Sequence, residues 1–184
     1  MLTKDNRSEL LSIAKKSISG FVTNRTIPKF EVEPAPLKTP SGVFVTIHKN
    51  GELRGCIGYS EPIKPLWEAV RDTAISAAVN DPRFEPVDKS ELPELEIEIS
   101  VLSPLKKTLS PEKIEVGKHG LLIKKGFYAG LLLPQVPVEL GWDREEFLRQ
   151  TCLKAGLPPD EWEKEAEIYT FEADIFSEKS KEKC

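Results

Sequence analysis

The sequence predicts an α+β protein with a mainly antiparallel sheet flanked by helices, and three observations support this fold class. Residues 94–101 alternate strictly between apolar and polar side chains, which is typical of an antiparallel strand with one buried and one solvated side. Segments 42–59 and 120–133 have the pattern of β-hairpins. Helical segments neither alternate regularly with the strands nor repeat, which argues against a parallel α/β fold.

The elements of the first half follow from local patterns. Residues 4–19 predict an amphipathic helix that Gly20 ends, and the proline-rich residues 23–41 predict an extended arm packed on the surface. The hairpin of residues 42–59 turns at Asn50-Gly51, a favoured tight turn. A helix over 65–80 follows, with Pro65 at its first position and small residues along its apolar stripe.

In the second half, Ser110-Pro111-Glu112 predicts a helical turn, and residues 120–124 and 127–133 a hairpin that ends at Pro134-Gln135. Asp143 is expected to cap a helix that Gly156 closes. We further expect a helix over 160–166, a final strand over 168–176 and a flexible charged tail over 177–184.

Length and composition exclude several classes of protein. The chain has 184 residues, enough for one domain to fold without a metal or disulfide, and its net charge of −4 excludes a generally basic nucleic-acid binder. We expect no membrane span because no apolar run approaches the roughly 18 residues that one requires. The three cysteines are too scattered for a disulfide framework or a zinc site. Without a signal-peptide pattern, a cytoplasmic protein is expected, and the abundance of Glu and Lys is typical of thermophiles.

The densest candidate for chemistry is the segment Leu53–Gly58, with the sequence Leu-Arg-Gly-Cys-Ile-Gly. Regular alternation places Arg54, Cys56 and Gly58 on one face, so that Arg54 would favour the nucleophilic thiolate of Cys56. Gly55 and Gly58 carry no side chain that would shield the thiol from a ligand. The alternative is that Cys56 is a small buried apolar residue, the glycines serve packing, and Arg54 reaches a carboxylate.

A nucleophilic cysteine needs a base, and the chain contains two histidines. A regular hairpin pairs Cys56 with Val45 and Arg54 with Ile47, which puts His48 on the other face from Cys56 unless the strand is bulged. His119 precedes a strand and either faces a cleft or is an exposed turn residue. No third orienting residue supports a catalytic triad.

The remaining cysteines and the basic residues are weaker candidates. Cys152 shares a helical face with apolar residues, which indicates an inert core thiol, and Cys184 is expected to be exposed and incidental. The basic stretch Lys106–Lys125 is a candidate for binding nucleotide or RNA, although Glu112 and Glu115 interrupt it and a solvated face explains it better. Dinucleotide, Walker and zinc-protease motifs are absent, so the sequence assigns neither a metal nor a cofactor.

Several separated motifs resemble the AMMECR family, and they occur in the family's order over nearly the whole chain. They are Leu53–Gly58, Asp81-Pro82-Arg83-Phe84, Leu105–Glu112, His119-Gly120-Leu121, Gly130–Val136 and the block Trp142, Phe147, Cys152, Ala155-Gly156-Leu157. The resemblance is to an archaeal member, and it implies a single domain over 1–184 with a larger and a smaller lobe. It also implies a functional site at Leu53–Gly58, and a pathway shared with Memo-like and radical-SAM proteins.

The first hypothesis is therefore an enzyme, or a component of a modifying system, with Cys56 as the catalytic residue. Its candidate substrate-binding residues are Arg54, Gly55, Gly58, His119 and Gln135. The alternative is a non-catalytic module that binds nucleotide or RNA, or docks a partner, in which the Leu53–Gly58 motif is structural.

Overall fold

The computed structural model describes residues 2–178, which form two compact units. The first unit comprises the chain up to Leu102 together with the chain from Asp174, and the second comprises Ser103–Ala173. Each unit contains its own sheet and its own cluster of buried apolar side chains. The predicted α+β class with antiparallel sheets flanked by helices is confirmed, and the strands are divided between two sheets.

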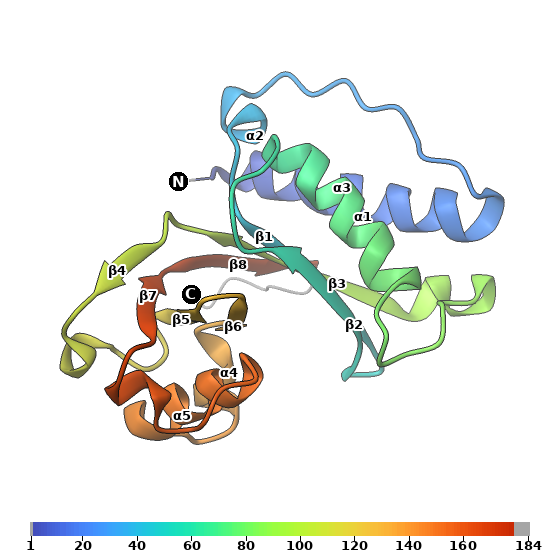
Figure 1. The fold of residues 1–184 in the computed structure, drawn as a ribbon. Helices are drawn as coiled ribbons and strands as arrows, with labels where there is room; N and C mark the ends of the chain where they lie inside the picture. Colours follow the sequence, from blue (N-terminus) through green and yellow to red (C-terminus); the bar gives the residue numbers. More distant parts are fainter. Residues whose placement is uncertain (1, 179–184) are drawn as a thin grey trace. The chain divides into compact units, whose positions relative to one another are not determined.

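The first unit has a four-stranded sheet in the order β2-β1-β3-β8. Helices α1 and α3 pack on one face of this sheet (Figure 1). The strands are β1 (Val43–Lys49), β2 (Glu52–Tyr59), β3 (Leu95–Leu102) and β8 (Ala173–Ser177). The helices are α1 (Lys4–Asn24), α2 (Ala35–Lys38), α3 (Leu66–Val79) and the 3₁₀ helix η1 (Lys89–Glu94).

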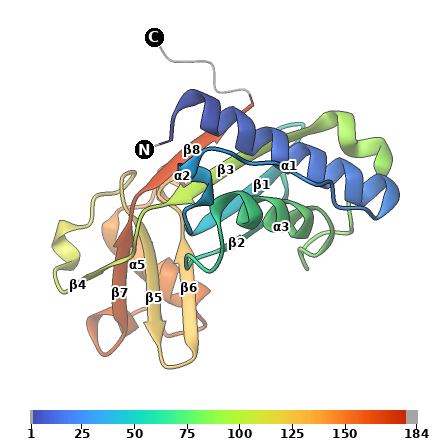
Figure 2. The same cartoon turned by 90° about the horizontal axis from the view of Figure 1, so that it is seen from above.

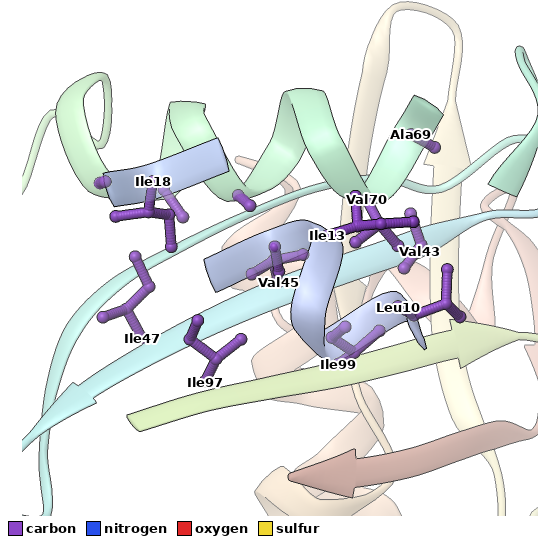
Figure 3. Close-up of a cluster of buried hydrophobic side chains, with 14 of the residues drawn as sticks. Leu10, Ile13, Ile18, Val43, Val45, Ile47, Ala69, Val70, Ile97 and Ile99 are labelled. Atoms are coloured by element: carbon purple, nitrogen blue, oxygen red, sulfur yellow. The ribbon is translucent and has the colours of Figure 1, made fainter. Parts of the chain in front are cut away.

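Apolar side chains on alternate positions of β1 and β3 form the core of this unit with the inner faces of α1 and α3. Figure 3 shows Val45 and Ile47 of β1 beside Ile97 and Ile99 of β3, beneath helical side chains such as Val70. Because successive strand residues point to opposite faces, Phe44, Thr46 and His48 of β1 lie on the sheet face opposite the helices.

Helix α1 is longer than the sequence predicts. The expected stop at Gly20 is wrong, since the helix continues to Asn24 and ends where Arg25 adopts a left-handed conformation with φ 56°. Gly20 instead permits a close approach by the following arm, because a Cβ atom there would lie 3.1 Å from Pro28. The expected extended arm over 23–41 is confirmed for residues 26–34, where buried Val32 anchors it, whereas residues 35–38 form the short helix α2 around buried Leu37.

The second unit has a four-stranded sheet in the order β4-β7-β5-β6, whose strands β7, β5 and β6 lie side by side in Figure 2. Helix α5 begins at a cap formed by Asp143, as expected, and packs on this sheet through buried Phe147, Leu148 and Cys152. The strands are β4 (Lys106–Thr108), β5 (Gly120–Lys125), β6 (Tyr128–Leu132) and β7 (Glu167–Phe171). The helices are η2 (Pro111–Lys113), α4 (Gln135–Glu139), α5 (Arg144–Lys154) and η3 (Glu161–Glu163).

Two expectations near the C-terminus are wrong. The single strand over 168–176 is two strands, β7 and β8, which belong to different sheets. Between them, Glu172 leaves the ladder and its backbone exchanges hydrogen bonds with Ser103, at 2.8 Å to the amide and 2.9 Å to the hydroxyl. The helix over 160–166 is reduced to the single 3₁₀ turn η3. Most of the expected tail, residues 179–184, lies outside the described residues.

Candidate functional site

The hairpin that carries the Leu53–Gly58 motif contains a β-bulge at Arg54. Strand β2 pairs Leu53 with His48 and Gly55 with Ile47, so Arg54 is an extra residue without a partner in the ladder. Cys56 therefore pairs with Thr46, not with Val45, and the expected pairing of Arg54 with Ile47 is also wrong. The physical reason is that an inserted residue shifts the register of every later pair by one.

The bulge decides which side chains share a face with the thiol. Cys56 is half-buried and lies on the sheet face opposite the helices, where the Thr46 hydroxyl donates a hydrogen bond to Sγ at 3.3 Å. His48, two residues beyond Thr46 on β1, lies on this same face and diagonally across the hairpin from Cys56. The expectation that His48 faces away from Cys56 held only for a regular strand, so the structure adds His48 to the candidate site.

The two glycines of the motif fill packing roles. A Cβ atom at Gly55 would lie 2.1 Å from the carbonyl oxygen of Ala77, so Gly55 allows α3 to approach β2 from the helical face. A Cβ atom at Gly58 would lie 2.4 Å from the Phe44 ring. Packing thus explains both glycines without a ligand, and their role in binding substrate stays a prediction.

Arg54 is held by groups other than the thiol. Its guanidinium donates to both carboxylate oxygens of Glu91, at 3.0 and 2.9 Å, and to the carbonyl oxygen of Glu85 at 2.9 Å. Lys49 bonds with the same carboxylate at 3.1 Å. These cations hold the pKa of Glu91 down to about 2, with the Arg54 hydrogen bond as the largest cause. The arrangement matches the alternative in which Arg54 reaches a carboxylate.

The cation close to Cys56 is Arg83, from the segment that follows α3. The backbone N–H of Cys56 donates to Oδ2 of Asp81 at 2.8 Å, and Nη2 of Arg83 donates to the same oxygen at 2.7 Å. The pKa of Arg83 is raised, chiefly by its hydrogen bond with Asp81. Sequence reasoning missed this pair as site residues, because the motif Asp81-Pro82-Arg83-Phe84 carries no local sign of a partner in β2.

Asp81 organises this edge of the sheet. It is 4% exposed and accepts hydrogen bonds from the Cys56 amide, the Arg83 amide and the Arg83 side chain. The Arg83 hydrogen bond is the largest cause that lowers the pKa of Asp81, which keeps the carboxylate charged. Strand β2 is the edge strand of its sheet, so Asp81 satisfies a backbone donor that no other strand reaches.

Cys152 provides a matched comparison for the thiol. It is 0% exposed in the core of the second unit, as predicted, and burial raises its pKa. Cys184 lies outside the described residues.

The remaining predicted site residues belong to the second unit. His119 lies in the loop before β5, where its Nδ1 accepts a hydrogen bond from the Glu115 amide at 3.0 Å. Gln135 is the first residue of α4 and is half-buried. The residues of the Leu53–Gly58 motif are in the first unit, and the substrate-binding roles of His119 and Gln135 stay predictions.

Carboxylates accompany much of the basic stretch Lys106–Lys125. Lys107 pairs with Glu167, Lys118 with Glu115, and Lys125 with Glu161 and Glu165. These ion pairs lower the positive charge available to a phosphate backbone. Binding of nucleotide or RNA stays a prediction that this geometry does not favour.

Within residues 2–178, no group of three or more His, Cys, Asp or Glu side chains is arranged to hold a metal ion. The described helices include none with the length and apolarity needed to cross a bilayer.

The fold and the site together define a class: an α+β protein of two units, each with an antiparallel sheet, and with a half-buried cysteine on an edge hairpin of the first. The chain belongs to the AMMECR1 family, whose model matches residues 11–176. This confirms the resemblance seen in the separated sequence motifs.

The relatives are archaeal proteins of similar length. Protein MK0488 of Methanopyrus kandleri is 50% identical over 98% of this chain and 92% of its own length. Protein MJ0810 of Methanocaldococcus jannaschii is 48% identical over 97% of this chain and 92% of its own length. The crystal structure of the uncharacterized protein PH0010 from Pyrococcus horikoshii superposes with a TM-score of 0.89 at 45% identity, covering 93% of this chain and 90% of that chain. Thermophilic organisms are among the sources of these relatives, in line with the Glu- and Lys-rich composition.

Proposed function

We propose that the protein is a thiol-dependent enzyme, or the thiol-bearing component of a modifying system, in which Cys56 is the nucleophile. The observation that carries this proposal is the position of half-buried Cys56 on the sheet face opposite the helices, where Thr46 donates a hydrogen bond to Sγ. The thiolate is the reactive form of a cysteine, and the proposed step therefore includes removal of the thiol proton. Cys152 is fully buried, which raises its pKa, and it serves as the inert internal reference.

In the proposed step, Sγ of Cys56 attacks an electrophilic carbon of the substrate. The S–C bond forms as the bond from that carbon to its leaving group breaks, and the leaving group departs with the electron pair. His48 accepts the thiol proton, since the strand register places its imidazole on the same face. Memo-like and radical-SAM proteins are the proposed partners in the pathway, on the basis of the family resemblance.

Selective alkylation of Cys56 is the direct test. We expect iodoacetamide at pH 7 to modify Cys56 at least about tenfold faster than Cys152 in the folded protein, because exposure and thiolate character together set the rate. Peptide mapping by mass spectrometry separates the two sites, and a Cys184→Ser background removes the third thiol. Denatured protein, in which both thiols are accessible, provides the control. Equal inertness of Cys56 and Cys152 in the native protein would contradict the proposal.

The proposal predicts different effects for substitutions of the two histidines, because only His48 acts as the base. We expect His48→Gln to slow alkylation of Cys56 at pH 7 about tenfold, since the imidazole is the proton acceptor in the proposed step. His119→Gln is the matched control and should leave the rate unchanged, because Nδ1 of His119 is bonded to the loop backbone. A slower rate in the His119 variant alone would transfer the role of base to that residue.

A further inference from the structure

The guanidinium of Arg83 is fixed in place by a buried carboxylate. Nε donates to Oδ1 of Asp81 at 3.0 Å and Nη2 donates to Oδ2 at 2.7 Å, which is a bidentate pairing. The Asp81 side chain is 2% exposed, whereas the Arg83 side chain is 54% exposed. The buried partner therefore orients one edge of the guanidinium and leaves the rest of the group to the solvent.

The solvent-facing part of Arg83 has unused donors. In the stretch from residue 2 to residue 178, Nη1 makes no hydrogen bond to protein, and the guanidinium carbon lies 5.4 Å from the centroid of the Phe84 ring. With Nε and one Nη2 proton bonded to Asp81, the distal edge presents parallel N–H groups from Nη1 and Nη2. Two parallel donors of this kind match the two oxygens of a planar carboxylate.

Arg83 is tied to the backbone of the nucleophile. Its Nη2 and the Cys56 amide nitrogen share Oδ2 of Asp81, at 2.7 and 2.8 Å, so the two nitrogens cannot be farther apart than these distances combined. An anion bound at the distal edge of Arg83 would therefore lie near the backbone of the residue that carries the thiol.

We propose that Arg83 binds a carboxylate group of the substrate and so directs the adjacent electrophilic carbon to Cys56. The inference rests on the proposed function, because it gives the substrate class of the same thiol: a small carboxylate whose reactive carbon lies next to the anionic group. Arg83 is the substrate-binding residue and Asp81 the residue that positions it. Arg54 cannot take this role while its guanidinium is bonded to Glu91 and Glu85.

A pair of reagents that differ only in charge tests the proposal. Iodoacetate and iodoacetamide present the same carbon and the same leaving group: the S–C bond forms, the C–I bond breaks, iodide leaves with the electron pair, and the thiol proton passes to His48 or buffer. The measured quantity is the rate at which iodoacetate alkylates Cys56 divided by the rate for iodoacetamide. Dividing this value by the same ratio for 2-mercaptoethanol gives the normalised ratio. We expect a value of about five or more at low salt, falling toward one in 0.5 M NaCl.

Variants assign the preference to Arg83. Arg83→Gln should lower the normalised ratio to about one or below, and Arg83→Lys should retain a value above one. Because the Gln variant leaves Asp81 without its cation, the double variant Asp81→Asn/Arg83→Gln removes both charges and should give a ratio near one. Arg71→Gln is the matched control, since Arg71 is also ion-paired in the first unit, and should keep the wild-type ratio.

The outcomes separate the two proposals. If neither reagent modifies native Cys56, the proposed function fails. If iodoacetamide reacts but the normalised ratio is near one, or the ratio is unchanged by Arg83→Gln, the nucleophile stands and the carboxylate site is overturned. Thermal unfolding of each variant verifies folding, and should Arg83→Gln not fold, the salt titration of the wild type and the Lys variant decide the question.

Discussion

Gly55→Ala is expected to destabilise the first unit by about 3 kcal/mol or more, even though alanine adds a single methyl group. The added Cβ atom would lie 2.1 Å from the carbonyl oxygen of Ala77 and 3.0 Å from its carbonyl carbon. Both atoms belong to the backbone of α3, so no side-chain rotation relieves the overlap and the helix must move away from β2. The separation would disturb the buried side chains that α3 places on the sheet, such as Val70 and Ala74.

Hydrogen exchange followed by mass spectrometry measures this effect in each unit separately. Peptides from β1, β2 and α3 should exchange faster in the variant, whereas peptides from β5, β6 and α5 should not change. Gly51→Ala is the control for conformation, because Gly51 has φ 83° but no atom within 4 Å of a Cβ. It should cost only about 1 kcal/mol, the strain of a left-handed alanine. Equal effects from the two substitutions would show that the contact with α3 is not the cause.

The elements that the sequence predicts correctly are those specified by neighbouring residues. Strict alternation identified β3, the Asn50-Gly51 turn identified the first hairpin, and Asp143 identified the start of α5. Each of these signals is complete within a few residues, so long-range contacts do not alter them.

The errors arise where a distant residue decides the local conformation. The bulge at Arg54 accompanies contacts of Arg54 with Glu91 and of Gly55 with Ala77, which are 37 and 22 positions away in the sequence. The sequence predicts a regular strand, in which His48 and Cys56 lie on opposite faces. The one-residue shift at the bulge puts them on the same face.

The same reasoning explains why the sequence favours Arg54 over Arg83 as the cation beside the thiol. Arg54 is two residues from Cys56 in the sequence, but the bulge and Glu91 direct its guanidinium elsewhere. Arg83 reaches the Cys56 region through Asp81, which bonds to the backbone of an edge strand and not to a side chain. No residue pattern in a single sequence encodes such a backbone contact.

Acid titration provides another test, because it distinguishes the structural role of Arg54 from the role of Arg83 near the thiol. Replacing Glu91 by Gln is expected to lower the free energy of unfolding at pH 7 and to have no effect near pH 2. The pKa of Glu91 is lowered from 4.5 to about 2 in the folded protein, chiefly by Arg54. Its stabilisation is therefore fully present above about pH 4.5 and is lost as the pH falls toward 2. The pKa difference sets an upper limit of about 3 kcal/mol, and solvent screening at this partly exposed cluster reduces it to about 1–2 kcal/mol.

The measurement is urea denaturation of the wild type, Glu91→Gln and Arg54→Gln between pH 2 and pH 7. The fluorescence of Trp67 reports unfolding of the first unit, in a background in which Trp142 and Trp162 are replaced by Phe. Both variants should converge with the wild type as the pH falls, because protonation of Glu91 removes the same ion pair that each substitution removes. The rate of Cys56 alkylation by iodoacetamide at pH 7 should stay within about twofold of the wild type in both variants, since Arg54 is bonded to Glu91 and Glu85. A large decrease of that rate in Arg54→Gln, with folding retained, would restore Arg54 as the partner of the thiolate and would remove the basis for assigning that role to Arg83.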